Sequence, residues 1–563
     1  MEKIWLKSYP PGVVAEIDVN EFRSVGDLFE KSCRKYAERT AYLNMDKGIT
    51  YAELDRLTAQ FAGYLQGELG LAKGARVAVM MPNVLQYPVC IFGILRSGYT
   101  VVNCNPLYTP RELEHQLKDS GAEVIVVVEN FASVLQEALP KTQVKHVVVT
   151  GLGDLLGFPK SMIVNFVVKH VKKMVPGWNI TGAQRFNDVL ARGSRHALKP
   201  VEVTHDDIAF LQYTGGTTGV AKGAMLTHRN IIANLQQAHA WIKPFLQEGN
   251  GIIVTPLPLY HIFSLTANCL TFVKVGWTNL LITNPRDIPG FVKELQKHRM
   301  NAITGVNTLF NALANHPDFA KLDFSTLQIS FAGGMAVQKA VAEKWQQITG
   351  KPLVEAYGLT ETSPAATINP LDLREFNGAI GLPVPSTEVA IRDDEGKDLP
   401  LGQPGELCIR GPQVMKGYYN RPDETAKVFT ADGFLRTGDV ATIDEKGFVR
   451  IVDRKKDLIL VSGFNVYPNE VEDVVARHPG VLEVAAVGVP DDKSGEAVKI
   501  FVVKRDPGLT VESVIAHCKE SLTGYKVPRV VEFRAELPKT NVGKILRRAL
   551  RDEEMSKQPK KAA

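Results

Sequence analysis

The sequence predicts an α/β protein with several subdomains: a large N-terminal domain of helix-covered sheets that ends in a β subdomain, and a small α+β C-terminal domain. Three observations support this fold class. Short apolar runs alternate with amphipathic stretches in the first half, turn signals separate shorter runs after about residue 380, and a compact α+β pattern begins at Asp453. We therefore divide the chain into residues 1–452, with the β subdomain at about 380–452, and residues 453–563.

Uninterrupted apolar runs mark the strands of the first half, because a strand buried on both faces needs no polar side. Turn signals such as DDEG and DEKG separate the short strands of the β subdomain, which indicates antiparallel pairing. The expected elements are strands at Arg76–Met81, Glu123–Val128, His146–Thr150, Glu388–Asp393, Gly405–Arg410, Gly447–Ile451, Val484–Val489 and Val498–Val503, helices at Tyr51–Leu69 and Glu512–Leu522, and a frayed tail at residues 551–563.

Composition excludes several classes of protein. Of the 563 residues, 45% are hydrophobic and 23% are charged, which is unlike a disordered, collagenous or coiled-coil chain. A net charge of +5 is too small to indicate a nucleic-acid partner. Six scattered cysteines lack metal or redox spacing, and the N-terminus has no apolar signal segment, so we expect reduced thiols and a cytoplasmic location. The longest uncharged stretch, Gly251–Val273, contains prolines and predicts a strand, a loop and a buried helix.

The segment Tyr213–Gly223, YTGGTTGVAKG, carries the strongest local signal. It follows an apolar run at Ile208–Leu211 and precedes a helical pattern at Asn230–Ala240. Its glycines let the backbone approach an anion, its threonines add hydroxyl donors, and Lys222 adds a cation, which together favour a polyphosphate. The spacing differs from a Walker A loop, and a flexible surface turn does not explain so dense a run of glycine and threonine. A second glycine pattern, at residues 151–157, is interrupted by Pro159 and is interpreted as an ordinary loop.

The same segment resembles the phosphate loop of the adenylate-forming superfamily, which contains acyl-CoA synthetases, luciferases and peptide-synthetase adenylation domains. Further superfamily motifs follow in the expected order: YGLTE at 357–361, TGD at 437–439, DRKKD at 453–457 and PKTNVGK at 538–544. The resemblance spans roughly residues 25–550. Residues 432–472 resemble the fatty acyl-CoA synthetase signature, and the most similar group is the bacterial long-chain fatty acid–CoA ligases.

This resemblance implies a reaction in two halves. A carboxylate attacks the α-phosphorus of ATP to give acyl-AMP and pyrophosphate, and the thiol of CoA then attacks the acyl carbonyl and releases AMP. ATP, Mg²⁺, CoA and a long-chain fatty acid are the implied ligands. The implied nucleotide-binding residues are Tyr213, Thr214, Gly215, Gly216, Thr217, Thr218, Gly219, Val220, Ala221, Lys222, Gly223, Gly333, Gly334, Tyr357, Gly358, Thr360, Asp439, Arg454, Lys456 and Lys544.

Individual roles follow from the matched motifs. The resemblance implies that Thr214–Lys222 hold the β- and γ-phosphates, that Thr214 and Glu361 contact Mg²⁺, and that Thr360 contacts the α-phosphate. It implies that Tyr357 stacks on adenine and that Asp439 accepts hydrogen bonds from the ribose hydroxyls. It also implies that Gly333, Gly334 and Gly358 let the backbone approach the nucleotide closely. The implied catalytic residues are Lys544, Lys222, Thr360, Glu361 and His261. The charge of Lys544 could stabilise the α-phosphate and carboxylate oxygens during the reaction. The alternative is that Lys544 is a solvated surface lysine without a catalytic role.

Asp453 resembles the superfamily hinge, about which the small, mobile C-terminal domain turns between the two half-reactions. Arg454 and Lys456 would meet the nucleotide in one of the two states. Many superfamily members have a lysine where this chain has Leu460, so a role for that lysine in the second half-reaction does not carry over.

The acyl group is inferred from the segment Pro256–Leu270, which lines the acyl pocket in the superfamily. It contains no Asp or Glu to pair with an ammonium group, which argues against an amino acid and favours an apolar tail. The expected substrate contacts are Tyr260, His261, Ile262, Phe263 and Leu265, with His261 at the pocket mouth. A satisfied core histidine remains the alternative for His261. An aryl-acid ligase of the coumarate type needs only a shorter, wider cavity and also remains open.

Residues 160–175 form a predicted basic amphipathic helix. At about 100° per residue, one face carries Ile163, Val164, Val167, Val168, Val171, Met174 and Val175, and the opposite face carries Asn165, Lys169, Lys172 and Lys173. Such a helix suits peripheral contact with the cytoplasmic, inner face of an anionic membrane. Docking on its own domain, or on a second subunit of a homodimer, explains the same pattern.

Three other functions share part of this evidence. A luciferase shares the motifs but adds an oxygenation step, and a free-standing adenylation domain hands its product to a carrier protein, although no carrier domain follows residue 550. A non-catalytic nucleotide or acyl sensor would have lost at least one of Lys222, Glu361, Asp439 and Lys544, and all four are present.

Overall fold

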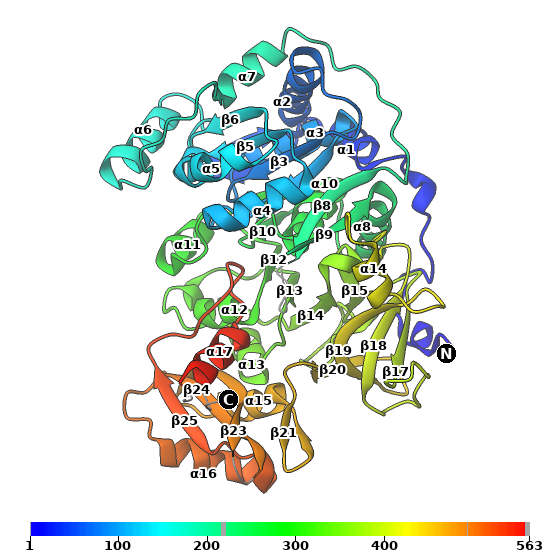
Figure 1. Ribbon diagram of the computed structural model, residues 1–563, viewed down its shortest axis with the longest axis vertical. Helices are drawn as coiled ribbons and strands as arrows, with labels where there is room; N and C mark the ends of the chain where they lie inside the picture. Colours follow the sequence, from blue (N-terminus) through cyan, green and yellow to red (C-terminus); the bar gives the residue numbers. More distant parts are fainter. Residues whose placement is uncertain (1, 215–220, 492–493, 558–563) are drawn as a thin grey trace.

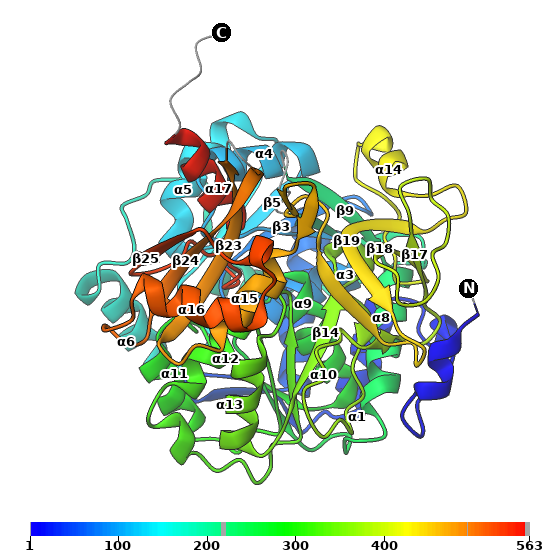
Figure 2. The same cartoon turned by 90° about the horizontal axis from the view of Figure 1, so that it is seen from below.

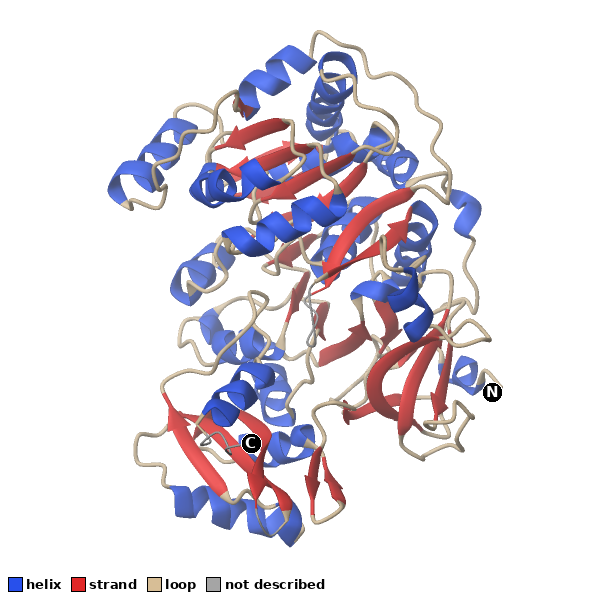
Figure 3. Cartoon of the chain, in the orientation of Figure 1, coloured by secondary structure: helices blue, strands red, loops and turns tan. Residues whose placement is uncertain are grey.

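The computed structural model describes residues 2–214, 221–491 and 494–557 (Figure 1). These residues form four sheets, and helices cover the two largest, so the predicted α/β class is confirmed (Figure 3). The seven-stranded sheet lies at one end of the long axis, the nine-stranded sheet in the middle and the C-terminal domain at the other end (Figure 1). In the described part of the chain, no helix is both long and apolar enough to cross a bilayer.

The seven-stranded sheet is parallel except for the hairpin that ends it. Successive residues of its strands face two separate cores: Val77 packs with α2 and α3, and Ala78 packs with α4 and α5. The predicted strands of the first half are confirmed to within one residue at each end. In the described residues the strand order is β7 (Gln184–Arg185), β6 (His146–Thr150), β5 (Val124–Val128), β3 (Arg76–Met80), β4 (Thr100–Asn103), β8 (Ile208–Thr214) and β9 (Lys222–Thr227). The accompanying helices are α1 (Val25–Lys35), α2 (Tyr51–Gly63), α3 (Gln86–Arg96), α4 (Pro110–Ser120), α5 (Ala132–Ala138) and α7 (Phe186–Gly193).

The nine-stranded sheet has a parallel centre and antiparallel edges. Its strands in the described chain run in the order β16 (Leu382–Pro383), β15 (Ala365–Ile368), β14 (Leu353–Gly358), β13 (Ile329–Gly333), β12 (Ala302–Gly305), β10 (Ile252–Thr255), β11 (Thr278–Leu281), β1 (Thr40–Asn44) and β2 (Lys47–Thr50). One face packs on α11 (Ile288–Leu295), α12 (Asn307–Ala314) and α13 (Lys339–Thr349), and the other on α8 (His228–Ile242) and α10 (Thr271–Val275). Helix α9 (Ile262–Ser264) and the π-helix η7 (Leu265–Leu270) contribute to the core shared with the seven-stranded sheet. The strand, loop and buried helix predicted for residues 251–273 are therefore confirmed.

The β subdomain is a four-stranded antiparallel sheet, as its turn signals predicted. Its strands are β17 (Glu388–Arg392), β18 (Gly405–Arg410), β19 (Leu435–Ile443) and β20 (Val449–Arg454), and α14 (Pro422–Val428) lies between β18 and β19. Strand β20 ends at Arg454, one residue past the predicted domain boundary at Asp453. The boundary itself stays a prediction.

The C-terminal domain combines a mixed sheet with three helices. Its elements are β21 (Ile459–Val461), β22 (Phe464–Val466), β23 (Val481–Asp491), β24 (Gly495–Lys504), β25 (Val530–Arg534), α15 (Pro468–Ala476), α16 (Val511–Ser521) and α17 (Arg547–Ser556). Viewed from below, this domain lies over α12 and α13 (Figure 2). The side-chain amide of Asn311 on α12 donates to the Leu482 carbonyl (2.9 Å) across this contact.

The frayed tail predicted for residues 551–563 is wrong over its first part. Helix α17 continues to Ser556, because Leu550 is fully buried and charged side chains tie the helix to the domain. Arg551 donates a hydrogen bond to Asp457 (2.7 Å), and Glu553 accepts hydrogen bonds from both terminal nitrogens of Arg534. Residues 558–563 lie outside the described residues.

The predicted helix at residues 160–175 is shorter and rotated. It begins as α6 (Lys160–Phe166) and continues as the π-helix η6 (Val167–Val171). Asn165, expected on the solvent face, instead accepts the Gly153 N–H (2.8 Å) and donates to Asp154 (2.9 Å), so this face packs on the domain. The glycine pattern at residues 151–157 is thus confirmed as an ordinary loop. The exposed apolar side chains around the helix are Phe158, Met162, Ile163, Phe166, Val171 and Met174.

All six cysteines are free, and every one is buried. Burial in apolar surroundings raises the pKa of each of these thiols, for example that of Cys408 to about 11.

Candidate active site

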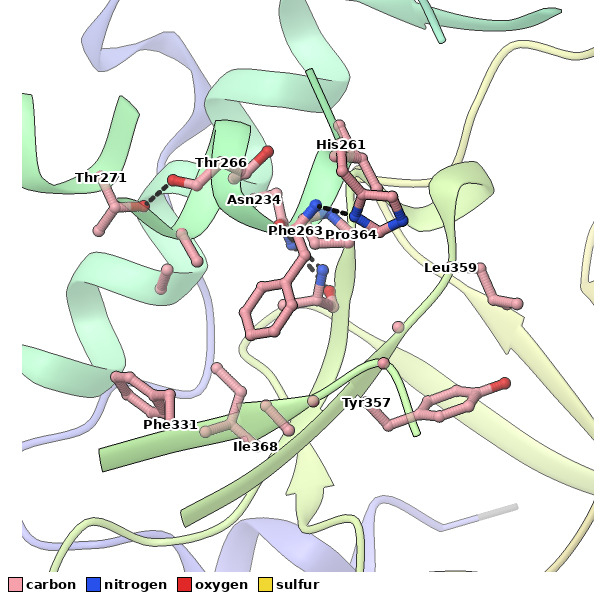
Figure 4. A pocket seen from close by; sticks show the side chains of 18 of the residues that line it. Asn234, His261, Phe263, Thr266, Thr271, Phe331, Tyr357, Leu359, Pro364 and Ile368 are labelled. Carbon is pink, nitrogen blue, oxygen red and sulfur yellow. Dashed lines mark hydrogen bonds between the residues drawn. The ribbon is translucent and has the colours of Figure 1, made fainter. Parts of the chain in front are cut away.

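A cavity lies where the carboxyl ends of β13 and β14 meet helices α8, α9 and α10 (Figure 4). The Thr227 hydroxyl caps α8 by accepting the Asn230 N–H (3.2 Å), and this start places Asn234, Ala238 and Ile242 at four-residue intervals along one cavity wall. The remaining lining residues are His261, Ile262, Phe263, Thr266, Ala267, Thr271, Phe272, Phe331, Gly333, Gly334, Ala356, Tyr357, Gly358, Leu359, Thr360, Pro364, Ala365, Ile368 and Lys544.

The interior of this cavity is apolar. Its polar side chains are already satisfied by the protein: Thr266 donates to the Ser363 carbonyl and Thr271 to the Thr266 carbonyl, both at 2.8 Å. Among the described residues that line it, only Lys544 carries a full charge. Ile262 and Phe263 line the cavity as predicted from the sequence, whereas Tyr260 and Leu265 are buried in a hydrophobic core outside the described lining. The wall formed by α8 and by Phe331 and Ile368 was not predicted.

Lys544 reaches the cavity mouth on a tight loop of the C-terminal domain. The Thr540 N–H donates to the Lys544 carbonyl (2.7 Å), and the Lys544 N–H donates back to the Thr540 hydroxyl (3.1 Å). Thr308 of α12 fastens the loop by donating to the Gly543 carbonyl (2.8 Å). Loss of water around the Lys544 ammonium, with repulsion from Arg454, lowers its pKa to about 8. The side chain is therefore a closely held cation and not a solvated surface lysine.

His261 lies beside this cation as a neutral ring. Its Nδ1 accepts the Phe263 N–H (3.3 Å) at the start of α9. Desolvation lowers the pKa of His261 to about 3, and the Lys544 charge acts in the same direction. Since Nδ1 accepts, the single proton of the neutral ring resides on Nε2, which can donate to an anionic oxygen.

The predicted adenosine contacts meet on the opposite side of the mouth. Tyr357, at the end of β14, donates to Asp439 Oδ2 (2.5 Å), and Arg454 Nε lies 3.4 Å from Asp439 Oδ1. Asp439 and Arg454 face each other across the β19–β20 ladder, which fixes their spacing. Lys456 lies in the turn after β20, where partial burial and Arg454 lower its pKa.

Gly333, Gly334 and Gly358, which were predicted to approach the nucleotide, each lie where a side chain would collide with a different neighbour. A Cβ at Gly334, where φ is +80°, would lie 2.9 Å from Lys544 Cε, so this glycine makes room for the loop that carries Lys544. A Cβ at Gly358 would lie 1.8 Å from the Pro364 carbonyl oxygen. A Cβ at Gly333 would contact Phe263 and the Ala356 carbonyl. Close packing within this chain therefore accounts for all three, whatever ligand binds.

The described ends of the predicted phosphate loop lie on the antiparallel strands β8 and β9. Residues Gly215–Val220, which are Gly215, Gly216, Thr217, Thr218, Gly219 and Val220, lie outside the described residues, while Thr214 pairs with Lys222 and Tyr213 with Gly223. The Tyr213 hydroxyl donates to Asp119 of α4 (2.7 Å), and its ring packs against Gly223. These two residues thus support the hairpin by packing. Ala221 and Lys222 follow the tip, and the Lys222 ammonium pairs with Glu424.

Thr360 and Glu361 lie on a single turn, η9 (Thr360–Thr362), directly after β14. Thr360 lines the cavity, and the turn packs beside β8 and β9. The Glu361 backbone carbonyl accepts the Met415 N–H (2.8 Å), and its Oε1 accepts the Tyr418 hydroxyl (2.7 Å). In the described residues no hydrogen bond is made to its second carboxylate oxygen, so Glu361 offers an oxygen ligand of the kind that Mg²⁺ prefers.

Asp453 connects the β subdomain to the C-terminal domain. It is fully buried in β20, and its Oδ2 accepts the Asn469 N–H (2.8 Å) at the start of α15. Arg547 of α17 lies 3.4 Å from Oδ1. Burial raises the pKa of Asp453 to about 6, although Arg547 acts in the opposite direction. One side chain on the last strand of the large domain is therefore bound by two helices of the small one.

Known proteins resemble this chain from end to end. Residues 29–419 match the AMP-binding enzyme family, and residues 470–544 match the AMP-binding enzyme C-terminal domain. The chain is 61% identical over 555 residues to a long-chain-fatty-acid–CoA ligase of Yersinia pestis, with 99% of both chains covered. It is 37% identical over 557 residues to a ligase of the same name from Bacillus subtilis, with 98% of both covered.

Solved structures show the same fold. An anthranilate CoA ligase in complex with anthranoyl-AMP superposes with a TM-score of 0.85 at 25% identity, covering 96% of this chain and 99% of that one. ATP-bound MatB from Rhodopseudomonas palustris superposes with a TM-score of 0.80 at 28% identity, covering 94% and 98%. With both family matches in order along the sequence, and with the same fold in solved members, the chain belongs to the family of AMP-binding enzymes.

Proposed function

We propose that this protein is a long-chain fatty acid–CoA ligase, which adenylates its substrate with ATP and then transfers the acyl group to CoA. The observation that carries this proposal is the apolar cavity with one cation, Lys544, at its mouth. An alkyl chain gains about 0.8 kcal/mol for each buried CH₂ group, so apolar walls alone can hold a long tail. The relatives of the same name agree with this substrate class.

The first half-reaction follows from the groups at the cavity mouth. The substrate carboxylate, oriented by the His261 Nε2–H, attacks the α-phosphorus of ATP, and the bond to the bridging oxygen breaks so that pyrophosphate leaves. Lys544 stabilises the negative charge that moves between the carboxylate and α-phosphate oxygens. Lys222 and the hairpin tip hold the β- and γ-phosphates, Tyr357 stacks on adenine, Asp439 accepts the ribose hydroxyls, and Thr360 donates to the α-phosphate.

Mg²⁺ fits the same end of the site. Glu361 and Thr214 supply oxygen atoms beside the phosphate hairpin, which is the donor set that a hard cation requires. When bound, the ion neutralises part of the polyphosphate charge. This chain contributes the position of the two oxygen ligands and of Lys222.

The second half-reaction needs a different arrangement of the C-terminal domain. In this structure Lys544 lines the cavity, which supports its use in adenylation. The CoA thiol must reach the acyl carbonyl before AMP can leave, so the loop that carries Lys544 has to withdraw. We assign the pivot to Asp453, after which Arg454 and Lys456 change their contacts with the nucleotide.

Chain length tests the substrate assignment. We expect AMP release with CoA to peak at twelve or more carbons when saturated fatty acids, coumarate, benzoate and anthranilate are compared. Ala238→Phe fills the apolar wall, so we expect it to lower kcat/KM for a sixteen-carbon acid by ~10-fold or more while an eight-carbon acid changes less than threefold. Ala240→Phe, on another face of α8, is the control. A maximum on the aryl acids would favour an aryl-acid ligase instead.

The exposed apolar side chains around α6 support peripheral contact with a membrane. Met162, Ile163 and Phe166 are 63%, 58% and 60% exposed, and Lys169 and Lys172 are exposed nearby. Apolar side chains beside lysines suit an anionic bilayer surface, from which a fatty acid can be drawn.

Liposome binding tests this contact. We expect the triple variant Met162→Ser, Ile163→Ser, Phe166→Ser to lose most co-sedimentation with anionic vesicles. Phe464→Ser removes an equally exposed aromatic side chain from the C-terminal domain and should change nothing. Unchanged co-sedimentation of the triple variant would reject membrane contact, and a simultaneous change from dimer to monomer would assign the surface to a second subunit.

A further inference from the structure

The segment of residues 415–428, here called the clamp segment, has contacts that the proposed mechanism does not use. Its first part runs as an added strand along β9: the Met225 N–H donates to the Gly417 carbonyl (2.9 Å), and the Tyr419 N–H to the Gly223 carbonyl (2.8 Å). The clamp segment is thus fixed to β9, which begins at Lys222.

The same segment contacts three charged residues outside it, which are Glu361, Lys222 and Asp119. The Tyr418 hydroxyl donates to Glu361 Oε1 (2.7 Å), and Glu424 pairs with the Lys222 ammonium, which also lies 5.1 Å from the centre of the Tyr418 ring. Arg421 forms an ion pair with Asp119 (2.6 Å). Asp119 also accepts the Tyr213 hydroxyl, so the clamp segment is anchored on both strands of the hairpin.

Tyr418 itself is closely held. Its side chain is 7% exposed, and its backbone N–H donates to the Thr425 hydroxyl (2.9 Å). A tyrosine hydroxyl is a neutral hydrogen-bond donor, and here it donates to Glu361 Oε1.

A neutral donor has a specific advantage at this carboxylate. A lysine or arginine in its place would cancel the Glu361 charge and compete with a cation, whereas a phenol fixes one oxygen and leaves the negative charge available. Because Met415 also fixes the Glu361 backbone, the second oxygen is directed by two contacts from one segment.

We propose that Tyr418 is a positioning residue that orients the Glu361 carboxylate for the metal ion of bound ATP. This inference rests on the proposed role of Glu361 as a metal contact. It assigns Tyr418 no contact with substrate, so its loss should weaken the metal and leave the other contacts of ATP intact.

The test measures metal binding directly. Binding of Mn²⁺ in the presence of ATP would be followed by electron paramagnetic resonance, and binding of ATP without metal by calorimetry. A hydrogen bond to a charged group corresponds to about a tenfold change or more, so we expect Tyr418→Phe to raise the Kd for Mn²⁺ about tenfold. The Kd for metal-free ATP should stay within twofold, and excess Mg²⁺ should restore most of kcat.

Tyr419→Phe is the matched control, because the Tyr419 hydroxyl has no hydrogen-bond partner among the described residues and its loss should leave both constants unchanged. Glu361→Gln separates the two hypotheses. If it leaves the Mn²⁺ constant unchanged, the proposed role of Glu361 fails. If it raises that constant while Tyr418→Phe behaves like Tyr419→Phe, the positioning role of Tyr418 is wrong.

Equal weakening of Mn²⁺ and of metal-free ATP in Tyr418→Phe would also overturn the inference, because it would mean loss of packing. Thioesterification of supplied acyl-AMP checks that the variant is folded, since this half-reaction uses no metal–ATP complex. Tyr418→Met, which also lacks the hydroxyl, gives a second measurement if the phenylalanine variant is unstable.

Discussion

Replacing Lys544 with alanine should abolish pyrophosphate release while the enzyme still makes acyl-CoA from supplied acyl-AMP. In the proposed mechanism the Lys544 ammonium stabilises charge only during the attack on the α-phosphorus, and its loop withdraws for the second half-reaction. Removing one such group costs about 10²–10³ in rate, and we expect ~10³-fold or more because no other charged side chain among the described residues lines the cavity. Pyrophosphate release without CoA and thioester formation from acyl-AMP measure the two halves separately.

The control is Lys539→Ala, which removes a lysine of the same loop that pairs with Glu483 (2.8 Å) outside the cavity. It should change neither rate more than a few-fold. The pH dependence gives a second check: because the pKa of Lys544 is lowered to about 8, its charge is present below that pH and is lost above it, so kcat/KM for ATP should fall as pH rises through about 8. Equal loss of both half-reactions in Lys544→Ala would contradict this role.

Replacing Asp453 with proline should slow thioesterification at least ~10-fold more than adenylation. A proline fixes φ near −65°, so a backbone that must turn between two arrangements is held close to one of them. In the proposed mechanism adenylation uses the arrangement described here, with Lys544 already in the mouth. The ratio of the two half-reaction rates, measured as for Lys544, is the decisive quantity.

The Asp453 side chain also holds the two domains together, so its loss must be separated from the backbone effect. Asp453→Ala removes the contacts with Asn469 and Arg547 but leaves φ free. If the alanine variant alters the ratio as strongly as the proline variant, the effect belongs to the carboxylate and the hinge assignment is wrong. An unchanged ratio in Asp453→Pro would also count against it.

Much of the site could be predicted from the sequence because its residues lie in short motifs that resemble those of the superfamily. The structure places these motifs where strands end: Thr214 and Gly333 close β8 and β13, and Tyr357 is the last residue but one of β14. The strands themselves were predictable since they are buried on both faces and consist of apolar runs. Lys544 was found by its motif and not by periodicity, because it lies in an irregular loop.

The remaining parts depend on contacts between distant segments. Glu361 and Tyr418 are 57 residues apart, and Lys222 and Glu424 are 202 residues apart, in stretches where no hydrophobic period indicates a partner. The sequence of α8 predicts that one face of the helix is buried, but it does not predict that this face forms a cavity wall. The prediction of which face of α6 is exposed was wrong. Asn165, on the face assigned to solvent from its polar residues, instead forms hydrogen bonds with the domain.

The burial of all six cysteines makes this chain a convenient subject for spectroscopy. Thiol labelling requires an accessible thiolate, and burial suppresses both access and ionisation at every native position. A cysteine introduced on the exposed surface of α13 and another on α16 would therefore be labelled selectively without first removing the native ones. The distance between two fluorophores at these sites would report the turn about Asp453 in a single molecule, as ATP, fatty acid and CoA are added in order.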